Sequence, residues 1–158
     1  MRAAGIGLLV LTAWAAAATA AGPGTLRVYS AIEVLDIENK RNAEGKKLPD
    51  EWMPRLREQI RYGLGSLHLF RQIEDQVDAT VTTPDTGRVV QLKLRITDFS
   101  GAQAQPKISA IVTFVDKATG EKVLEKAVDA QLYFDQSATT GALIKLTNKT
   151  GSLVKDNW

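Results

Sequence analysis

The feature that most constrains the fold is a hairpin centred on Ala118-Thr119-Gly120, between two segments of alternating hydrophobicity. A four-residue loop over residues 117–120 would place Asp116 opposite Glu121, a pair of like charges. A three-residue loop over residues 118–120 shifts the register by one and pairs Asp116 with Lys122 instead. We therefore predict the three-residue loop, with its glycine at the position that needs a positive φ. The apolar pairs are then Phe114 with Leu124, Ala110 with Val128 and Ile108 with Ala130.

The rest of the sequence predicts an α+β fold around this hairpin. Lys126 interrupts the apolar row opposite Val112, which indicates that its strand lies at a sheet edge. The expected fold is a mainly antiparallel, four- to five-stranded sheet with two helices on one face, in the order strand-helix-strands-helix. The further elements are strands over residues 26–37, 69–74 and 88–99, an amphipathic helix capped by Asp50 with Pro54 near its first position, and a closing helix after residue 135.

Residues 1–21 differ in kind from the rest of the chain. Arg2 precedes an alanine-rich apolar run, Ala18-Thr19-Ala20 offers small residues for cleavage, and Gly22-Pro23-Gly24 follows. This pattern predicts a secretory signal peptide, with an uncleaved membrane anchor as the alternative. The chain has no cysteine, so we expect neither disulfides nor lipid attachment after the apolar run. Residues 25–158 are expected to form a single periplasmic domain.

The composition argues against two functional classes. Of the 158 residues, 20 are basic and 18 are acidic, and the basic ones are interspersed, so we expect no nucleic-acid partner. His68 is the single histidine, and we predict no metal site and no cofactor. Asp85-Thr86-Gly87 has the lettering of an aspartic protease but follows turn residues, so we interpret it as a turn. A hydrolase that uses the strand-end residues Asp98, Asp116, Asp129 and Asp135 remains a third hypothesis.

One surface stands out as a candidate site. In the predicted register, several apolar residues fall on the sheet face opposite the core row, beside charged side chains. A half-apolar exposed face of this kind is typical of a partner surface, although a covering helix or the N-terminal strand would explain it equally well. The candidate partner surface comprises Lys93, Arg95, Ile111, Val115, Val123, Glu125 and Tyr133.

Two segments carry a family resemblance: residues 94–99, Leu-Arg-Ile-Thr-Asp-Phe, and residues 111–124, which run through Asp-Lys-Ala-Thr-Gly. They resemble the bacterial family called domain of unknown function 4410, small secreted or lipid-anchored envelope proteins. That family is similar in layout to the activator domains of peptidoglycan synthases and to the N-terminal domain of the Tol-system propeller protein, which bind partner proteins and catalyse nothing. Two features depart from the family: a lipobox cysteine is absent, and Gly101 stands alone where members have a glycine-rich stretch.

These observations lead to one expected function and one alternative. We expect an exported, non-enzymatic envelope protein that acts as a protein-binding or adaptor module, with an envelope protein as its partner and no stable membrane anchor once the signal peptide is cleaved. The resemblance implies no catalytic residue. The alternative is a carrier of a small hydrophobic ligand or lipid, with a pocket between sheet and helices beneath Trp52 and Leu56.

Overall fold

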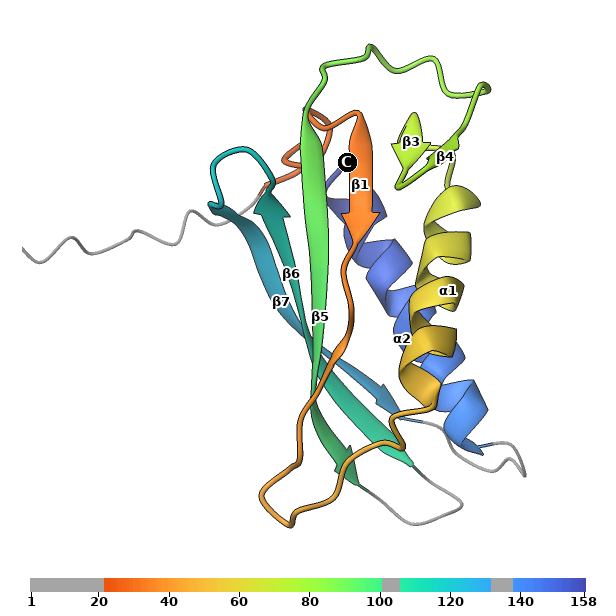
Figure 1. Cartoon of the computed structure of the whole chain (residues 1–158), viewed down its shortest axis with the longest axis vertical. Helices are drawn as coiled ribbons and strands as arrows, with labels where there is room; N and C mark the ends of the chain where they lie inside the picture. Colours follow the sequence, from red (N-terminus) through yellow and green to blue (C-terminus); the bar gives the residue numbers. More distant parts are fainter. Residues whose placement is uncertain (1–21, 101–105, 132–137) are drawn as a thin grey trace, which may run out of the picture.

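The computed structural model describes residues 22–100, 106–131 and 138–158, and the predicted signal peptide lies outside them (Figure 1). Strands and helices form in these residues broadly where alternation and helical periodicity predict them. The elements are β1 (Ala31–Val34), β2 (Glu38–Asn39), α1 (Trp52–Gly65), β3 (Gln72–Ile73), β4 (Gln76–Val77), β5 (Val89–Ser100), β6 (Lys107–Asp116), β7 (Lys122–Gln131) and α2 (Ala138–Asp156).

The sheet is mixed and has seven strands in the described residues, so the prediction of a mainly antiparallel sheet of four or five strands is wrong. The strand order is β4-β3-β1-β5-β6-β7, and β2 also pairs with β5. Strand β1 runs parallel to both β3 and β5, whereas β5, β6 and β7 are antiparallel. Alternation predicts a strand but not its direction, which here follows from the crossover through α1 between β1 and β3. The two-residue strands β2, β3 and β4 are too short to give a periodic signal.

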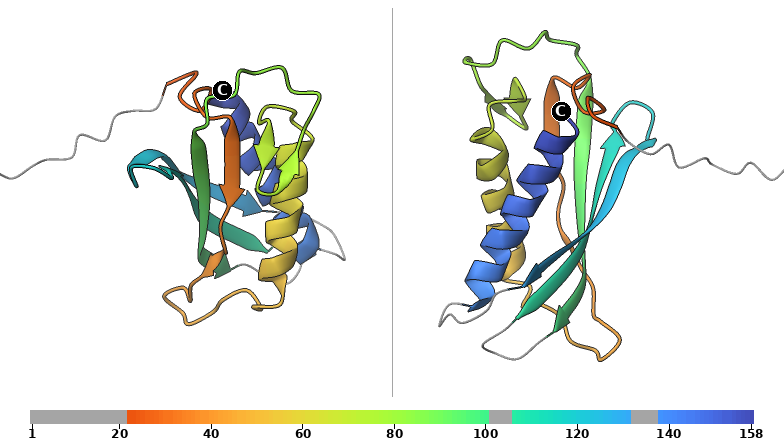
Figure 2. Two further views of the ribbon diagram at one scale, coloured as in Figure 1. Left: turned by 45° about the horizontal axis from the view of Figure 1, so that its top comes forward. Right: turned by 180° about the vertical axis from the view of Figure 1, so that it is seen from behind.

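Both helices cover the same face of the sheet, as predicted (Figures 1 and 2). The inward residues of β5 alternate along the strand and are at most 1% exposed. They share one hydrophobic cluster with the buried stripe of α1 and with residues of α2. The opposite face of β5 and β6 carries no helix in the described part of the chain. The central buried set is Val90, Leu92, Leu94 and Ile96 from β5, with Leu56, Ile60 and Leu64 from α1.

The N-terminal half departs from prediction at two points. Residues 23–28 form turns instead of the start of a strand, because the buried Leu26 bonds through its N–H to the carbonyl of Asn157 at 2.8 Å. Helix α1 follows Glu51 and places Pro54 at its third position. Asp50 does not cap it, since its carboxylate accepts hydrogen bonds from Asn39 and Lys47 instead.

The hairpin confirms the predicted apolar register but not the predicted loop. Phe114 pairs with Leu124, and the pairs of Ala110 and Ile108 are also as predicted. At the tip, however, the N–H of Asp116 donates to the carbonyl of Glu121 at 2.9 Å, which leaves the four-residue loop over residues 117–120. The register shifts between Phe114 and Val115. This one irregularity beside the loop allows the predicted apolar pairs to form even though the loop has four residues.

Two side-chain details explain why the four-residue loop is tolerated. The Asp116 carboxylate turns back onto the loop, where it accepts hydrogen bonds from the N–H groups of Ala118 and Thr119 at 2.8 and 3.1 Å. It therefore does not oppose Glu121 as a free charge. Gly120 has φ 73°, the left-handed conformation predicted for it. Strand β7, which carries the exposed Lys126, lies at the end of the sheet order, as predicted.

Candidate partner-binding groove

Three antiparallel strands present ordered rows of side chains on the sheet face opposite the helices. Because the inward residues of β5 are buried, the residues between them point to this outer face. Strand pairing then places each outer residue beside a known neighbour on the next strand. One row contains Lys93, Thr113 and Glu125, and the next contains Glu38, Arg95 and Ile111.

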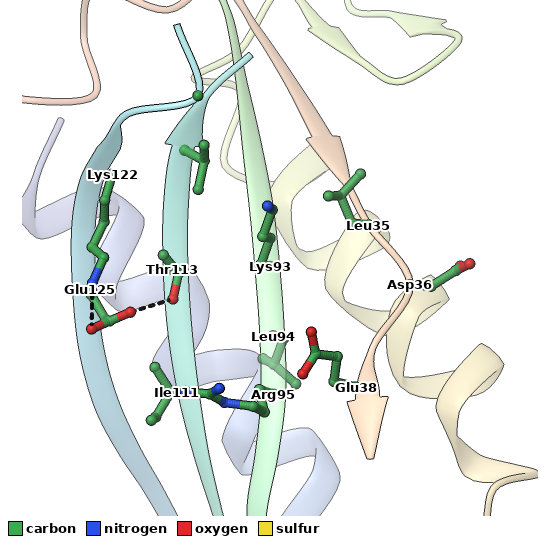
Figure 3. Close-up of a pocket in the computed structure, with 12 residues that line it drawn as sticks. Leu35, Asp36, Glu38, Lys93, Leu94, Arg95, Ile111, Thr113, Lys122 and Glu125 are labelled. Atoms are coloured by element: carbon green, nitrogen blue, oxygen red, sulfur yellow. Dashed lines mark hydrogen bonds and ion pairs between the residues drawn. The ribbon is translucent and has the colours of Figure 1, made fainter. Parts of the chain in front are cut away.

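These rows border an open groove of about 490 Å³ on the outer face (Figure 3). Its floor comes from β5 and β6, one wall from the segment that joins β1 to β2, and the other wall from β7 and the hairpin loop. The lining is Leu35, Asp36, Glu38, Lys93, Leu94, Arg95, Ile111, Thr113, Val115, Gly120, Lys122 and Glu125.

Five of the seven residues of the predicted partner surface line this groove: Lys93, Arg95, Ile111, Val115 and Glu125. Val123 does not line it, because the register shift beside the loop leaves this side chain partly buried against the hydrophobic core. Tyr133 lies outside the described residues. Strand alternation on β5, β6 and β7 thus brings these five residues together on one face.

Sequence reasoning missed several lining residues for identifiable reasons. Thr113 lies between Ile111 and Val115 on the same face, so alternation alone could have included it. Lys122 enters because the register shift pairs it with Val115. The acidic wall, Asp36 and Glu38, depends on the parallel pairing of β2 with β5, for which the sequence carries no local signal.

The groove contains both paired and unpaired charges. Glu125 accepts hydrogen bonds from Lys122 Nζ at 2.9 Å and from Thr113 Oγ1 at 3.0 Å. These bonds, the lysine's first, lower the pKa of Glu125. In contrast, Lys93 and Arg95 form no hydrogen bond or ion pair with any residue in the described part of the chain. The two basic groups at the centre of the groove are therefore available to a ligand.

A charged cluster fixes the hairpin tip at one end of the groove. Asp116 is buried and accepts hydrogen bonds from Arg88 Nη2 at 2.6 Å and from the Tyr29 hydroxyl at 3.0 Å. The arginine bond is the main cause that lowers the pKa of Asp116 to about 2. Arg88 also lies over the Tyr29 ring at 4.7 Å, and Lys117 pairs with Glu33 of β1. These bonds tie the loop to β1 and β5, and they agree with a structural role for the Asp-Lys-Ala-Thr-Gly sequence.

The other motifs occupy structural positions as well. The Asp85 carboxylate accepts hydrogen bonds from Gly87 N–H and Ser30 Oγ, both at 2.9 Å, which confirms the turn interpretation of this tripeptide. Asp98 lies near the C-terminal end of β5, where its carboxylate accepts a hydrogen bond from Ser100 Oγ. Asp116 lies on β6 and pairs with Val90, at the N-terminal end of β5. These two carboxylates therefore do not share a cleft.

No group of three or more histidine, cysteine, aspartate or glutamate side chains is placed to hold a metal ion within residues 22–100, 106–131 and 138–158. Among the helices that the structure describes, none is both long and apolar enough to cross a membrane.

The carrier alternative requires space between the sheet and the helices. Leu56 is fully buried there, in the same cluster as the inward residues of β5, and Trp52 packs against that cluster. Two further pockets lined by described residues open elsewhere, one near Thr82 and Trp158 and one between the outer surfaces of α1 and α2. The side chains that the carrier hypothesis would place around a ligand are thus engaged in the core.

Comparison with known proteins identifies a fold but no family. No protein-family model and no curated protein matches the chain. Among solved structures, a PelC dodecamer from Paraburkholderia phytofirmans is similar with a TM-score of 0.54 and 10% identity, over 82% of this chain and 92% of that one. The hypothetical protein CT253 from Chlamydia trachomatis has a TM-score of 0.54 and 13% identity, over 80% of this chain and 96% of that one.

Protein XCC0632 from Xanthomonas campestris, described by the family model DUF330, has a TM-score of 0.53 and 10% identity, over 87% of this chain and 86% of that one. The likeness shows the fold alone. It places the chain among folds found in bacterial proteins, including a domain of unknown function. Membership of the domain of unknown function 4410 family stays a prediction.

Proposed function

We propose that this protein is an exported, non-enzymatic envelope protein that works as a protein-binding module through the groove on its outer sheet face. The observation that carries the proposal is that groove: it is open, about 490 Å³ in volume, and combines apolar floor residues with two unpaired cations. Exposed apolar surface bordered by charged groups is what protein interfaces present before they associate.

The proposed location rests on the N-terminal sequence. The apolar run before residue 22, with small residues at its end, has the pattern of an export signal. The bacterial origin of the structures that share this fold agrees with an envelope protein, and one of them is described as a dodecamer, so the fold is used in a protein assembly. The expectation that the protein is not lipidated rests on its lack of cysteine.

A binding role also fits the state of the ionisable groups at the site. Asp116 and Glu125 are held in their charged forms by hydrogen bonds, as the lowered pKa of each shows. A general acid or base needs a pKa close to the working pH, and both carboxyls are shifted away from it. Fixed charges of this kind suit recognition by complementary charge.

The test is a pull-down of the tagged full chain from envelope extract. The wild type should recover a specific protein, and Ile111→Asp should lose it because a carboxylate would then lie in the apolar floor of the groove. Ile144→Asp is the matched control, since Ile144 is 48% exposed on α2, away from the groove. Recovery of no partner by the wild type, or equal recovery by Ile111→Asp, would refute the proposal.

A further inference from the structure

Each carboxylate that lines the groove lies beside a cation other than the two of β5. The three carboxylates come from β2, from the segment before it and from β7. None of their ion pairs uses Lys93 or Arg95, and Asp36 points away from the groove floor (Figure 3). The pairs are Asp36 with Arg57 at 3.7 Å, Glu38 with Lys40 at 3.7 Å and Glu125 with Lys122 at 2.9 Å.

The two cations of β5 are thereby left without a contacting counter-charge. Lys93 is exposed and Arg95 is half-buried, and neither forms a hydrogen bond or ion pair within the described residues. They flank the buried Leu94, so both side chains leave β5 on the outer face, about 6.7 Å apart along the strand. Glu38 and Glu125 lie within electrostatic range of Arg95, but each contacts its own lysine instead.

Apolar side chains lie beside these cations. Ile111 on β6 is the strand neighbour of Arg95, and Val115 lies further along the same face of β6. Leu35 adds an apolar side chain from the wall beside β5. A segment that enters the groove would therefore meet apolar surface and two unpaired cations within a short length of sheet.

We propose that the groove receives an acidic segment of a partner protein, with carboxylates on Lys93 and Arg95 and an apolar side chain on Ile111. This inference rests on the proposed function and specifies the chemistry of its partner. In an extended segment, carboxylates two residues apart have the same spacing as the two cations. A basic segment would bring like charges onto both cations, which opposes binding. A flat anionic membrane fits the site less well, because the floor lies between two walls.

The experiment joins amines to the carboxylates that they contact. The tagged full chain is incubated with envelope extract and treated with a water-soluble carbodiimide, which couples a lysine amine to a carboxylate with loss of water. Mass spectrometry of the wild type should find an amide bond between Lys93 and an aspartate or glutamate of another protein. Lys93→Arg keeps the charge without the amine, so it should retain the partner and lose this link. Arg95→Lys should add a second link, at position 95.

Charge reversal measures how much the two cations contribute. The double variant Lys93→Glu with Arg95→Glu should bind the recovered protein at least about tenfold more weakly than the wild type does. Lys126→Glu is the matched control, since Lys126 is exposed on β7 outside the groove lining, and it should leave binding unchanged. Short poly-L-glutamate should displace the recovered protein from the wild type, whereas free glutamate at the same residue concentration should not.

The outcomes separate this inference from the proposed function. If Lys93 links to no carboxylate of another protein, or if the double variant binds as well as the wild type, the acidic segment is refuted. Cosedimentation of the wild type with phosphatidylglycerol vesicles that the double variant loses would refute it too, because the cations would then serve a membrane. If Ile111→Asp still loses the recovered protein in these cases, the proposed function stands and only this inference fails. Recovery of no protein by the wild type would refute both.

Discussion

Glycine-to-alanine substitutions at two positions give a sharp test of the backbone described for the hairpin. Gly120 closes the loop with φ 73°, and a Cβ added there would meet no atom within 4 Å. Gly151 lies inside α2, where an added Cβ also meets no atom within 4 Å and φ is not positive. Because packing is neutral at both positions, the two substitutions differ in backbone conformation alone.

The expected effects have opposite signs. An L-residue in the left-handed region costs about 1–2 kcal/mol, and the lower entropy of the unfolded chain returns about half a kcal/mol, so Gly120→Ala should destabilise the protein by about 1 kcal/mol. In a helix, alanine is favoured over glycine by about 1 kcal/mol, so Gly151→Ala should stabilise it by about that amount. For a domain of this size, each change corresponds to a shift in Tm of about 3–4 °C.

Denaturant unfolding followed by circular dichroism measures both variants against the wild type. The midpoint should fall for Gly120→Ala and rise for Gly151→Ala, with an unchanged slope that shows the same surface exposed on unfolding. Asparagine tolerates the left-handed conformation better than alanine, so Gly120→Asn should lie between Gly120→Ala and the wild type. A neutral or stabilising Gly120→Ala would refute the left-handed loop residue, and shifts of the same sign in both alanine variants would refute the reasoning as a whole.

Three further predictions address the core, the charged tip and the helix contact. Phe114→Ala should destabilise the protein by about 3–5 kcal/mol in the same denaturant assay, because this side chain is fully buried. Val77→Ala is the control: this residue is 72% exposed, so the unfolding free energy should change by less than about 0.5 kcal/mol. Asp116 has a pKa lowered from 3.8 to about 2, so its stabilising contribution is complete above pH 4 and is lost as the pH falls toward 2. In acid titration, Asp116→Asn should therefore be less stable at neutral pH and lose less stability over that range than the wild type; equal losses would contradict the assignment. Gly63→Ala would bring a Cβ to 3.2 Å from Thr147 Cγ2, so its Tm should rise less than that of Gly151→Ala, where an added Cβ meets no atom within 4 Å. Adding Thr147→Ser, which removes that methyl group, should raise the Tm of Gly63→Ala further.

The central part of the fold was predictable because its signals are local and regular. The outer and inner faces of β5 follow from strict alternation, and the apolar pairs of Phe114 and Ala110 follow from matching two alternating segments across a turn. The stripe of α1 follows from helical periodicity. These elements also supply the floor of the groove, which is why Lys93 and Ile111 were identified from the sequence as one surface.

The parts that prediction missed depend on pairing between segments far apart in the chain. Strand β1 pairs with β5 across more than fifty residues, and no turn between them fixes direction or register. The loop at the hairpin tip was predicted from a regular register, in which a four-residue loop would set Asp116 and Glu121 opposite each other as a like-charge pair. Arg88 and Tyr29, both remote in sequence, hold the Asp116 carboxylate and remove that objection. Local charge rules fail where a distant residue supplies the counter-charge.

The same two irregularities that escaped prediction are what make the outer face into a groove. Strand β5 pairs with β1 and, further along, with β2, and the segment between these two strands carries Leu35 and Asp36. This segment forms one wall of the groove. On the other side, the register shift at the hairpin tip turns Val123 toward the core and places Lys122 beside Val115. A regular sheet with the predicted loop would have presented Val123 outward and a flatter face. The recognition surface thus arises from the departures from regular pairing, and the place of Glu38 beside Arg95 could be recognised only once the parallel strand β2 beside β5 was known.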